Sequence, residues 1–131
     1  MTTTKERKNQ LMVWANEVIG SSSICKDGVI ISDSYNGQIA AFSVSVALSG
    51  LKPAVALYYS GKGSSDVDKK EIIKLLAAMY SKEKKIQTNA DAFFQLVINA
   101  NEDLAVLQKK IIEYGIALKL AVRTFKFRNH E

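Results

Sequence analysis

The chain has 131 residues, of which 47% are apolar and 24% are charged. This length fits one domain of ordinary size, and this balance excludes a disordered, collagen-like or low-complexity chain. The 18 lysine and arginine residues outnumber the 13 acidic residues, and the net charge of +5 suggests an anionic partner without identifying it. We therefore expect a single globular domain over residues 1–131.

One cysteine is present, Cys25, so the chain can form neither an intramolecular disulfide nor a CxxC pair. Such a chain suits a reducing compartment. The basic first ten residues are not followed by an apolar run with a cleavage site, so no secretory signal is predicted. The uncharged stretch from Ser34 to Leu51 contains glycines and several polar residues, which makes it a poor membrane span. We expect a cytoplasmic protein with no membrane partner.

The first half of the chain predicts two helices from capping patterns. Thr3 and Glu6 have the spacing of a capping box, and apolar residues then recur at helical intervals, which predicts a helix over residues 4–19. Ser65 or Asp68 is positioned to cap another helix, with apolar residues on one face and lysines on the other.

Between these helices, residues 42–58 give conflicting signals. Apolar and small residues alternate in the first half of this segment, and a second apolar run follows a turn-like step, so the pattern alone slightly favours a β-hairpin. The alternative places Ile39, Phe42 and Val46 on one helical face and begins the next helix at Pro53.

Two further helices are predicted in the last third of the chain. Thr88 with Asp91, and Asn99 with Glu102, repeat the capping pattern. The second of these helices is expected over residues 102–127, and its length favours packing inside a bundle over a dimeric coiled coil. Its apolar stripe, with spacings of three and four, consists of Leu104, Leu107, Ile111, Tyr114, Leu118, Ala121 and Phe125.

Few residues are suited to catalysis. The only histidine, His130, lies near the last residue, which argues against a histidine-dependent triad or metal site. Two carboxylate pairs, Asp66 with Asp68 and Glu102 with Asp103, lie at predicted helix N-termini, where the helix dipole favours negative charge. We therefore expect no enzyme, no catalytic residue, no metal and no cofactor. A small metal-dependent enzyme that uses Asp66 and Asp68 is the weaker hypothesis.

The excess of positive charge lies in the last part of the sequence. Residues 109–131 hold six cations and two anions, a balance of +4, while residues 1–108 hold twelve cations and eleven anions. Lys119, Arg123 and Lys126 have the spacing i, i+4 and i+7, which would place them on one face of the predicted last helix. Such a row can follow a phosphate backbone, although cations also gather at helix C-termini because of the dipole.

The segment YNGQIAAFSVSVALSGLKPAVALYYSGKG, residues 35–63, resembles the signature region of the small subunit of the type III-B CRISPR effector, the Cmr RNA-guided complex. The resemblance centres on SGLKPAVALYYS, and residues 102–127 look like the last helix of that family. It implies an all-α bundle of about five to six helices that ends in a long amphipathic helix. We expect this fold, with an α+β fold that contains a hairpin at residues 42–58 as the alternative.

The resemblance also implies a non-catalytic function in antiviral defence. Such a subunit stacks in several copies beside the crRNA-binding backbone subunits and contributes a basic surface to the groove for target RNA. Its implied partners are the backbone and other effector subunits, further copies of itself, and the phosphate backbone of target or guide RNA. The alternative is a stand-alone helical DNA-binding or phage-type structural protein that uses the same basic helix.

The implied RNA contacts are electrostatic, and sequence specificity is left to base pairing with the guide. By position in the motif, Lys119 is the first candidate, and helix geometry adds Arg123 and Lys126. The weaker candidates are Lys109, Lys110 and Lys52.

Overall fold

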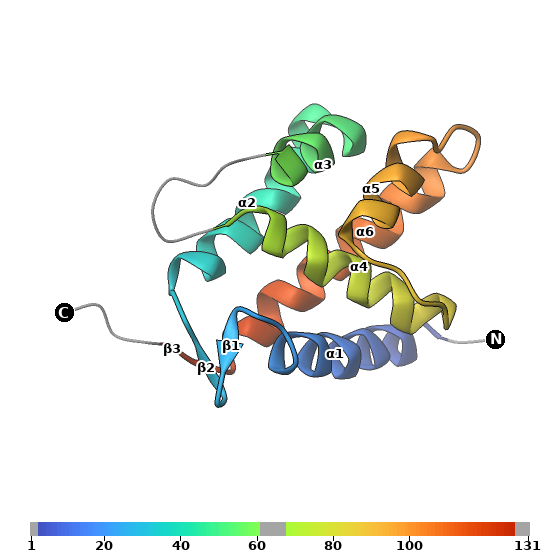
Figure 1. Cartoon of the computed structure of the whole chain (residues 1–131). Coiled ribbons are helices and arrows are strands. Elements are labelled where there is room, and N and C mark those ends of the chain that lie inside the picture. Colours follow the sequence, from blue (N-terminus) through green and yellow to red (C-terminus); the bar gives the residue numbers. More distant parts are fainter. Residues whose placement is uncertain (1–2, 61–67, 128–131) are drawn as a thin grey trace.

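Helices form most of the chain in a computed structural model, which describes residues 3–60 and 68–127. Within these ranges the fold is a helical bundle with one very small sheet (Figure 1), so the expected all-α architecture is confirmed. The helices are α1 (Thr4–Gly20), α2 (Ser34–Ser49), α3 (Leu51–Ser60), α4 (Lys70–Lys84), α5 (Ala90–Ile98) and α6 (Leu104–Val122). The strands are β1 (Cys25–Lys26), β2 (Val29–Ile30) and β3 (Lys126–Phe127).

The long helix α6 is the centre of the bundle. It contacts α1, α2 and α4, while α4 also contacts α1, α3 and α5. In Figure 1, α6 runs between α1 and α2 and passes behind α4. The predicted apolar stripe is buried from Leu107 to Ala121, and Leu104 and Phe125 at its two ends are partly buried. No helix in the described part of the chain is both long enough and apolar enough to span a membrane.

The helix starts agree with the capping predictions to different degrees. Thr3 caps α1 as predicted, because its Oγ1 accepts a hydrogen bond from the Glu6 N–H at 3.1 Å. The cap of α5 is Asn89 instead of Thr88, and its Oδ1 accepts from the Ala92 N–H at 2.8 Å. Asn99 ends α5 and does not begin the next helix.

Residues 42–58 are helical, so the slight preference for a hairpin was wrong. The four buried residues of α2 are Tyr35, Ile39, Phe42 and Val46, which have the spacing of a helix face. The other apolar members of the alternating run point outward, with Leu48 82% exposed. The two-residue period therefore did not reflect burial, because packing against α3 and α6 selects one helical face and overrides local strand preference.

The break between α2 and α3 is Gly50, whose φ of 89° is a conformation that residues with a side chain rarely adopt. Its backbone N–H donates to the Val46 carbonyl at 2.9 Å and closes the end of α2. The next helix begins at Leu51, two residues before Pro53. Proline fits the first turn of a helix because its missing N–H would have no partner there.

A three-stranded sheet in the order β1-β2-β3 was not predicted. Its hairpin turns at Asp27 and Gly28, with φ values of 52° and 77°, and Asp-Gly is a strong hairpin signal. Strand β3 pairs in parallel with β2, so the predicted helix over residues 102–127 is too long at its C-terminal end. Two short turns after α6, Thr124 N–H to Ala121 and Phe125 N–H to Val122, redirect the chain into this strand.

Helices α2 and α6 approach closely at Gly115. A Cβ atom on Gly115 would lie 2.7 Å from the Ser43 Oγ, and no other described atom outside α6 itself would be within 4 Å. That Ser43 oxygen is buried and has no hydrogen-bond partner among the described residues. Glycine at position 115 therefore leaves room for one hydroxyl group in the α2–α6 contact.

Gly115→Ala should lower the free energy of unfolding by about 1 kcal/mol, because the new methyl group overlaps the Ser43 oxygen. Ser43→Ala should be neutral or slightly stabilising, since it removes a buried oxygen that lacks a partner. The double variant should be at least as stable as the parent protein, because alanine is about 1 kcal/mol better than glycine inside a helix. Urea unfolding of all four proteins measures this cycle, and additive effects of the two substitutions would contradict the proposed contact.

Candidate nucleic-acid interface

The predicted row of Lys119, Arg123 and Lys126 does not lie on one helix face. Lys119 is in the last turn of α6, and Arg123, with φ of −69° and ψ of −15°, keeps helical backbone geometry just after it. These two side chains therefore share a face as predicted. Lys126 lies in β3, because the chain has left the helix before it.

The structure gives Lys126 a neighbour that the sequence analysis missed. In the small sheet, Lys26 pairs with Val29, and Val29 pairs with Lys126, so the three side chains form one row across the strands. Lys26 and Lys126 are exposed, and their Cα atoms are about 10 Å apart at ordinary strand spacing. The opposite face of the sheet includes Ile30, which is fully buried.

The end of α6 is joined to the start of α2 by Arg123, whose Nε donates to the Asn36 Oδ1 at 3.4 Å. We call Lys26, Lys119, Arg123 and Lys126 the basic surface. None of its three lysines forms an ion pair with another described residue. One carboxylate, Asp27, occupies the hairpin turn beside Lys26.

Lys52, a weaker candidate from the sequence, has a structural role. Its Nζ donates to the Ile98 carbonyl at 2.8 Å, at the C-terminal end of α5. A cation is favourable there because the last carbonyls of a helix lack partners and carry partial negative charge. This bond also ties α3 to α5.

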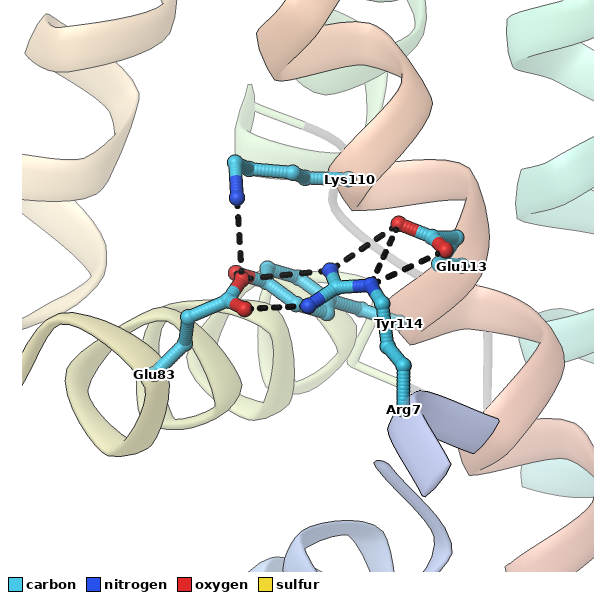
Figure 2. A network of polar contacts seen from close by, with 5 residues as sticks. All are labelled: Arg7, Glu83, Lys110, Glu113 and Tyr114. Atoms are coloured by element: carbon cyan, nitrogen blue, oxygen red, sulfur yellow. Dashed lines mark hydrogen bonds and ion pairs between the residues drawn. The ribbon is translucent and has the colours of Figure 1, made fainter. Parts of the chain in front are cut away.

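Lys110 is part of the network in Figure 2, which joins α1, α4 and α6. Its Nζ lies 3.4 Å from the Glu83 Oε1, which also accepts from the Tyr114 hydroxyl at 2.6 Å. Arg7 donates to Glu83 at 2.5 Å and to Glu113 at 2.9 Å. Two cations and two carboxylates therefore compensate each other, and Lys110 is not available as an uncompensated charge.

The environment of this network stabilises its charged groups. Burial opposes ionisation of Glu83, but hydrogen bonds from Arg7 and Tyr114, with the charges of Arg7 and Lys110, lower the pKa of Glu83 to about 2. The hydrogen bonds from Arg7 to Glu83 and Glu113 raise the pKa of Arg7 above its ordinary value. Burial, and then the hydrogen bond to Glu83, raise the pKa of Tyr114. The network therefore holds Arg7 and Glu83 charged and Tyr114 neutral at neutral pH.

Lys109 is exposed on α6 and is not in an ion pair with any residue the structure describes. It precedes Lys119 by ten residues, which is about 15 Å along a helix axis. Lys109 therefore lies outside the basic surface.

The carboxylates singled out from the sequence have positions typical of helix starts. The Asp68 Oδ1 accepts from the Lys70 N–H at 3.0 Å before α4, and Asp103 precedes the first residue of α6. Asp66 and His130 lie outside the described residues. In residues 3–60 and 68–127, no cluster of three or more metal-ligating side chains occurs.

Glu83→Gln tests the network, because it keeps the size of the side chain and removes its charge. We expect the free energy of unfolding at pH 7 to fall by about 2 kcal/mol, since Arg7 and Lys110 lose a partly buried partner. The pKa of Glu83 drops from 4.5 to about 2 on folding, so its contribution is complete above 4.5 and is lost as the pH falls toward 2.

Urea unfolding between pH 7 and pH 2.5 should therefore show the difference between the parent and the variant shrinking as the pH falls. Glu17→Gln is the matched control, because Glu17 pairs with Lys82 at 2.6 Å on a half-exposed surface. Its cost should stay below about 0.5 kcal/mol. A constant gap for Glu83→Gln across this pH range would contradict the assignment.

Comparison with known proteins does not add a relative: no family model, no curated protein and no solved structure matches this chain.

Proposed function

We propose that the chain is the small, non-catalytic subunit of a type III-B CRISPR RNA-guided effector complex, and that its basic surface contacts the phosphate backbone of target or guide RNA. Two lines of support meet in this proposal. One is the resemblance of residues 35–63, and the other is the presence of lysines without carboxylate partners on the small sheet and in the last turn of α6.

The resembling segment builds the α2–α3 corner. Tyr58 packs edge-on against Phe42 with ring centroids 5.1 Å apart, and its hydroxyl lies 3.4 Å from the Gln38 carbonyl. Leu51, Val55 and Tyr58 are all buried. The residues of the SGLKPAVALYYS segment therefore position helices, and RNA contact in this proposal falls to other residues.

The observation that carries the RNA contact is the basic surface itself. Lys26 and Lys126 lie in one row across the sheet with Val29 between them, and Lys119 and Arg123 lie at the end of the helix that leads into it. Lys70, Lys74, Lys82 and Lys110, by contrast, pair with carboxylates. Clustered lysines without carboxylate partners attract phosphates and release counterions on binding, in a manner that does not depend on sequence.

The test uses the complex assembled with its guide RNA and backbone subunit. Replacing Lys26, Lys119 and Lys126 with alanine should weaken target-RNA binding about tenfold or more, because three cations are lost from one surface. The slope of log affinity against log salt should fall by about 0.7 for each phosphate contact removed. A filter-binding titration over a salt series measures both quantities.

The matched control replaces Lys5, Lys84 and Lys85 with alanine, which removes the same charge. The start of α1 and the end of α4, which carry these residues, lie across the molecule from the sheet (Figure 1). Equal losses in the two triple variants would show a general charge effect and contradict the site. Tight duplex-DNA binding by the purified chain alone, without co-purifying CRISPR RNA, would instead favour a stand-alone DNA-binding protein.

A further inference from the structure

Helix α6 has a groove along its outward side. The N-terminal half of the helix lines a hollow of about 460 Å³ that extends from Leu104 to Glu113. The C-terminal half lines a second hollow of about 220 Å³ against α1, which extends from Glu113 to Leu120. Glu113 lines both hollows, so they adjoin at this side chain. We call the two together the α6 groove, and it follows the helix axis for about 24 Å.

The α6 groove exposes a stripe of apolar side chains. Ile112, Ile116 and Leu120 follow one another at intervals of four residues, which places them on one side of the helix. Ile116 and Leu120 are each 46% exposed, and Met12 of α1 is part of the wall beside them. An apolar stripe in a groove of this kind is the shape that receives the apolar face of another helix.

The side chains that line the α6 groove carry an excess of positive charge. Lys8 lines it from α1 and Lys109 from α6, and neither forms an ion pair with another described residue. The one carboxylate among the described lining residues is Glu113, which is neutralised by Arg7 at 2.9 Å. It is also the only acidic residue of α6. Two cations of the groove are therefore left without a carboxylate partner among the described residues.

The positive charge continues past the C-terminal end of the groove. Lys119 and Arg123 follow Ile116 and Leu120, respectively, by three positions, so each cation is next to an apolar residue of the stripe. Lys109 and Lys119 thus lie toward opposite ends of the same stripe. Complementary charge across an interface steers association, and like charge is penalised, so this distribution favours an acidic partner.

An acidic amphipathic helix matches both the apolar stripe and the cations. Its apolar face packs on the stripe, and acidic residues at the edge of that face lie beside the lysines. Nucleic acid matches only the cations, because phosphates gain nothing from contact with Ile116 and Leu120. A second copy of the chain offers its uncharged helix α2, whose exposed Val44 and Leu48 match the stripe but leave the lysines without carboxylates.

We propose that the α6 groove binds an acidic amphipathic helix of about four turns from another protein. The apolar face of this helix packs on Ile112, Ile116 and Leu120, and its carboxylates pair with Lys8 and Lys109. The dissociation constant is on the order of 10 µM, because a single helix buries less surface than a standard interface. The inference does not rest on the proposed RNA contact, since these five side chains lie outside the basic surface.

Fluorescence anisotropy with a labelled synthetic peptide tests the groove. The probe is a helix of about 16 residues with leucines three and four positions apart, glutamates beside them and alanines elsewhere. The purified chain should bind it at low salt, and binding should weaken as salt rises. A peptide of the same composition in scrambled order keeps the charge and loses the apolar face, so it should bind at least about tenfold more weakly. Equal binding of the two peptides would overturn the proposal.

Charge reversal in the groove tests the role of its lysines. Lys8→Glu with Lys109→Glu should raise the dissociation constant of the acidic peptide at least about tenfold, because attraction becomes repulsion. The same double variant should gain affinity for a peptide in which lysines replace all the glutamates. Lys84→Glu with Lys85→Glu is the matched control, since it makes the same charge change at the end of α4, outside the groove. Equal losses in the two double variants would show a general charge effect and contradict the site.

Removal of the apolar stripe tests the other half of the contact. Ile116→Ser with Leu120→Ser should also weaken peptide binding about tenfold, while Leu57→Ser, at a position 52% exposed on α3, should leave it unchanged. These positions are exposed, and thermal unfolding verifies that each variant remains folded.

An oligouridine strand titrated against the same proteins separates this site from the basic surface. Its binding should not change in Ile116→Ser with Leu120→Ser, because serine leaves every cation in place. RNA binding that falls together with peptide binding would identify the groove as a nucleic-acid site and overturn the proposal.

Discussion

One guanidinium group, that of Arg7, joins α1 to two other helices. Arg7 donates to Glu83 of α4 and to Glu113 of α6, so three helices meet at a single planar side chain. The opposite side of α6 is fixed differently, because the absence of a Cβ at Gly115 lets Ser43 of α2 approach. Charge on one side and steric fit on the other together hold α6 between α1 and α2.

This arrangement divides the lysines by role. Lys110 and Lys52 each neutralise negative charge inside the fold, a carboxylate in one case and helix carbonyls in the other. Lys26, Lys119 and Lys126 form no ion pair with any described residue. The uneven charge along the sequence is therefore only a partial guide to function, because a lysine with a carboxylate or carbonyl partner contributes little field to an anionic ligand.

The sequence was sufficient to predict a feature when the residues that determine it lie within one helix. The burial of Leu107 through Ala121 follows from the spacing within α6, and Thr3 caps α1 through a local bond. The sequence was insufficient where residues far apart in the chain determine the local structure. Whether the 42–49 run is helix or strand depends on what covers Phe42 and Val46, and the row that contains Lys26 depends on pairing between Val29 and Lys126, 97 positions later. Only the Asp27–Gly28 turn of that sheet has a readable local signal.

The parallel pairing of β3 with β2 has a consequence for biosynthesis. Lys26 and Lys126 are 100 positions apart in the sequence, so a ribosome completes all six helices before the second lysine exists. Contacts between segments so far apart form late, since closing a long loop costs entropy that earlier packing has to offset. A nascent chain thus completes the row of Lys26, Val29 and Lys126 only after its helices have been made.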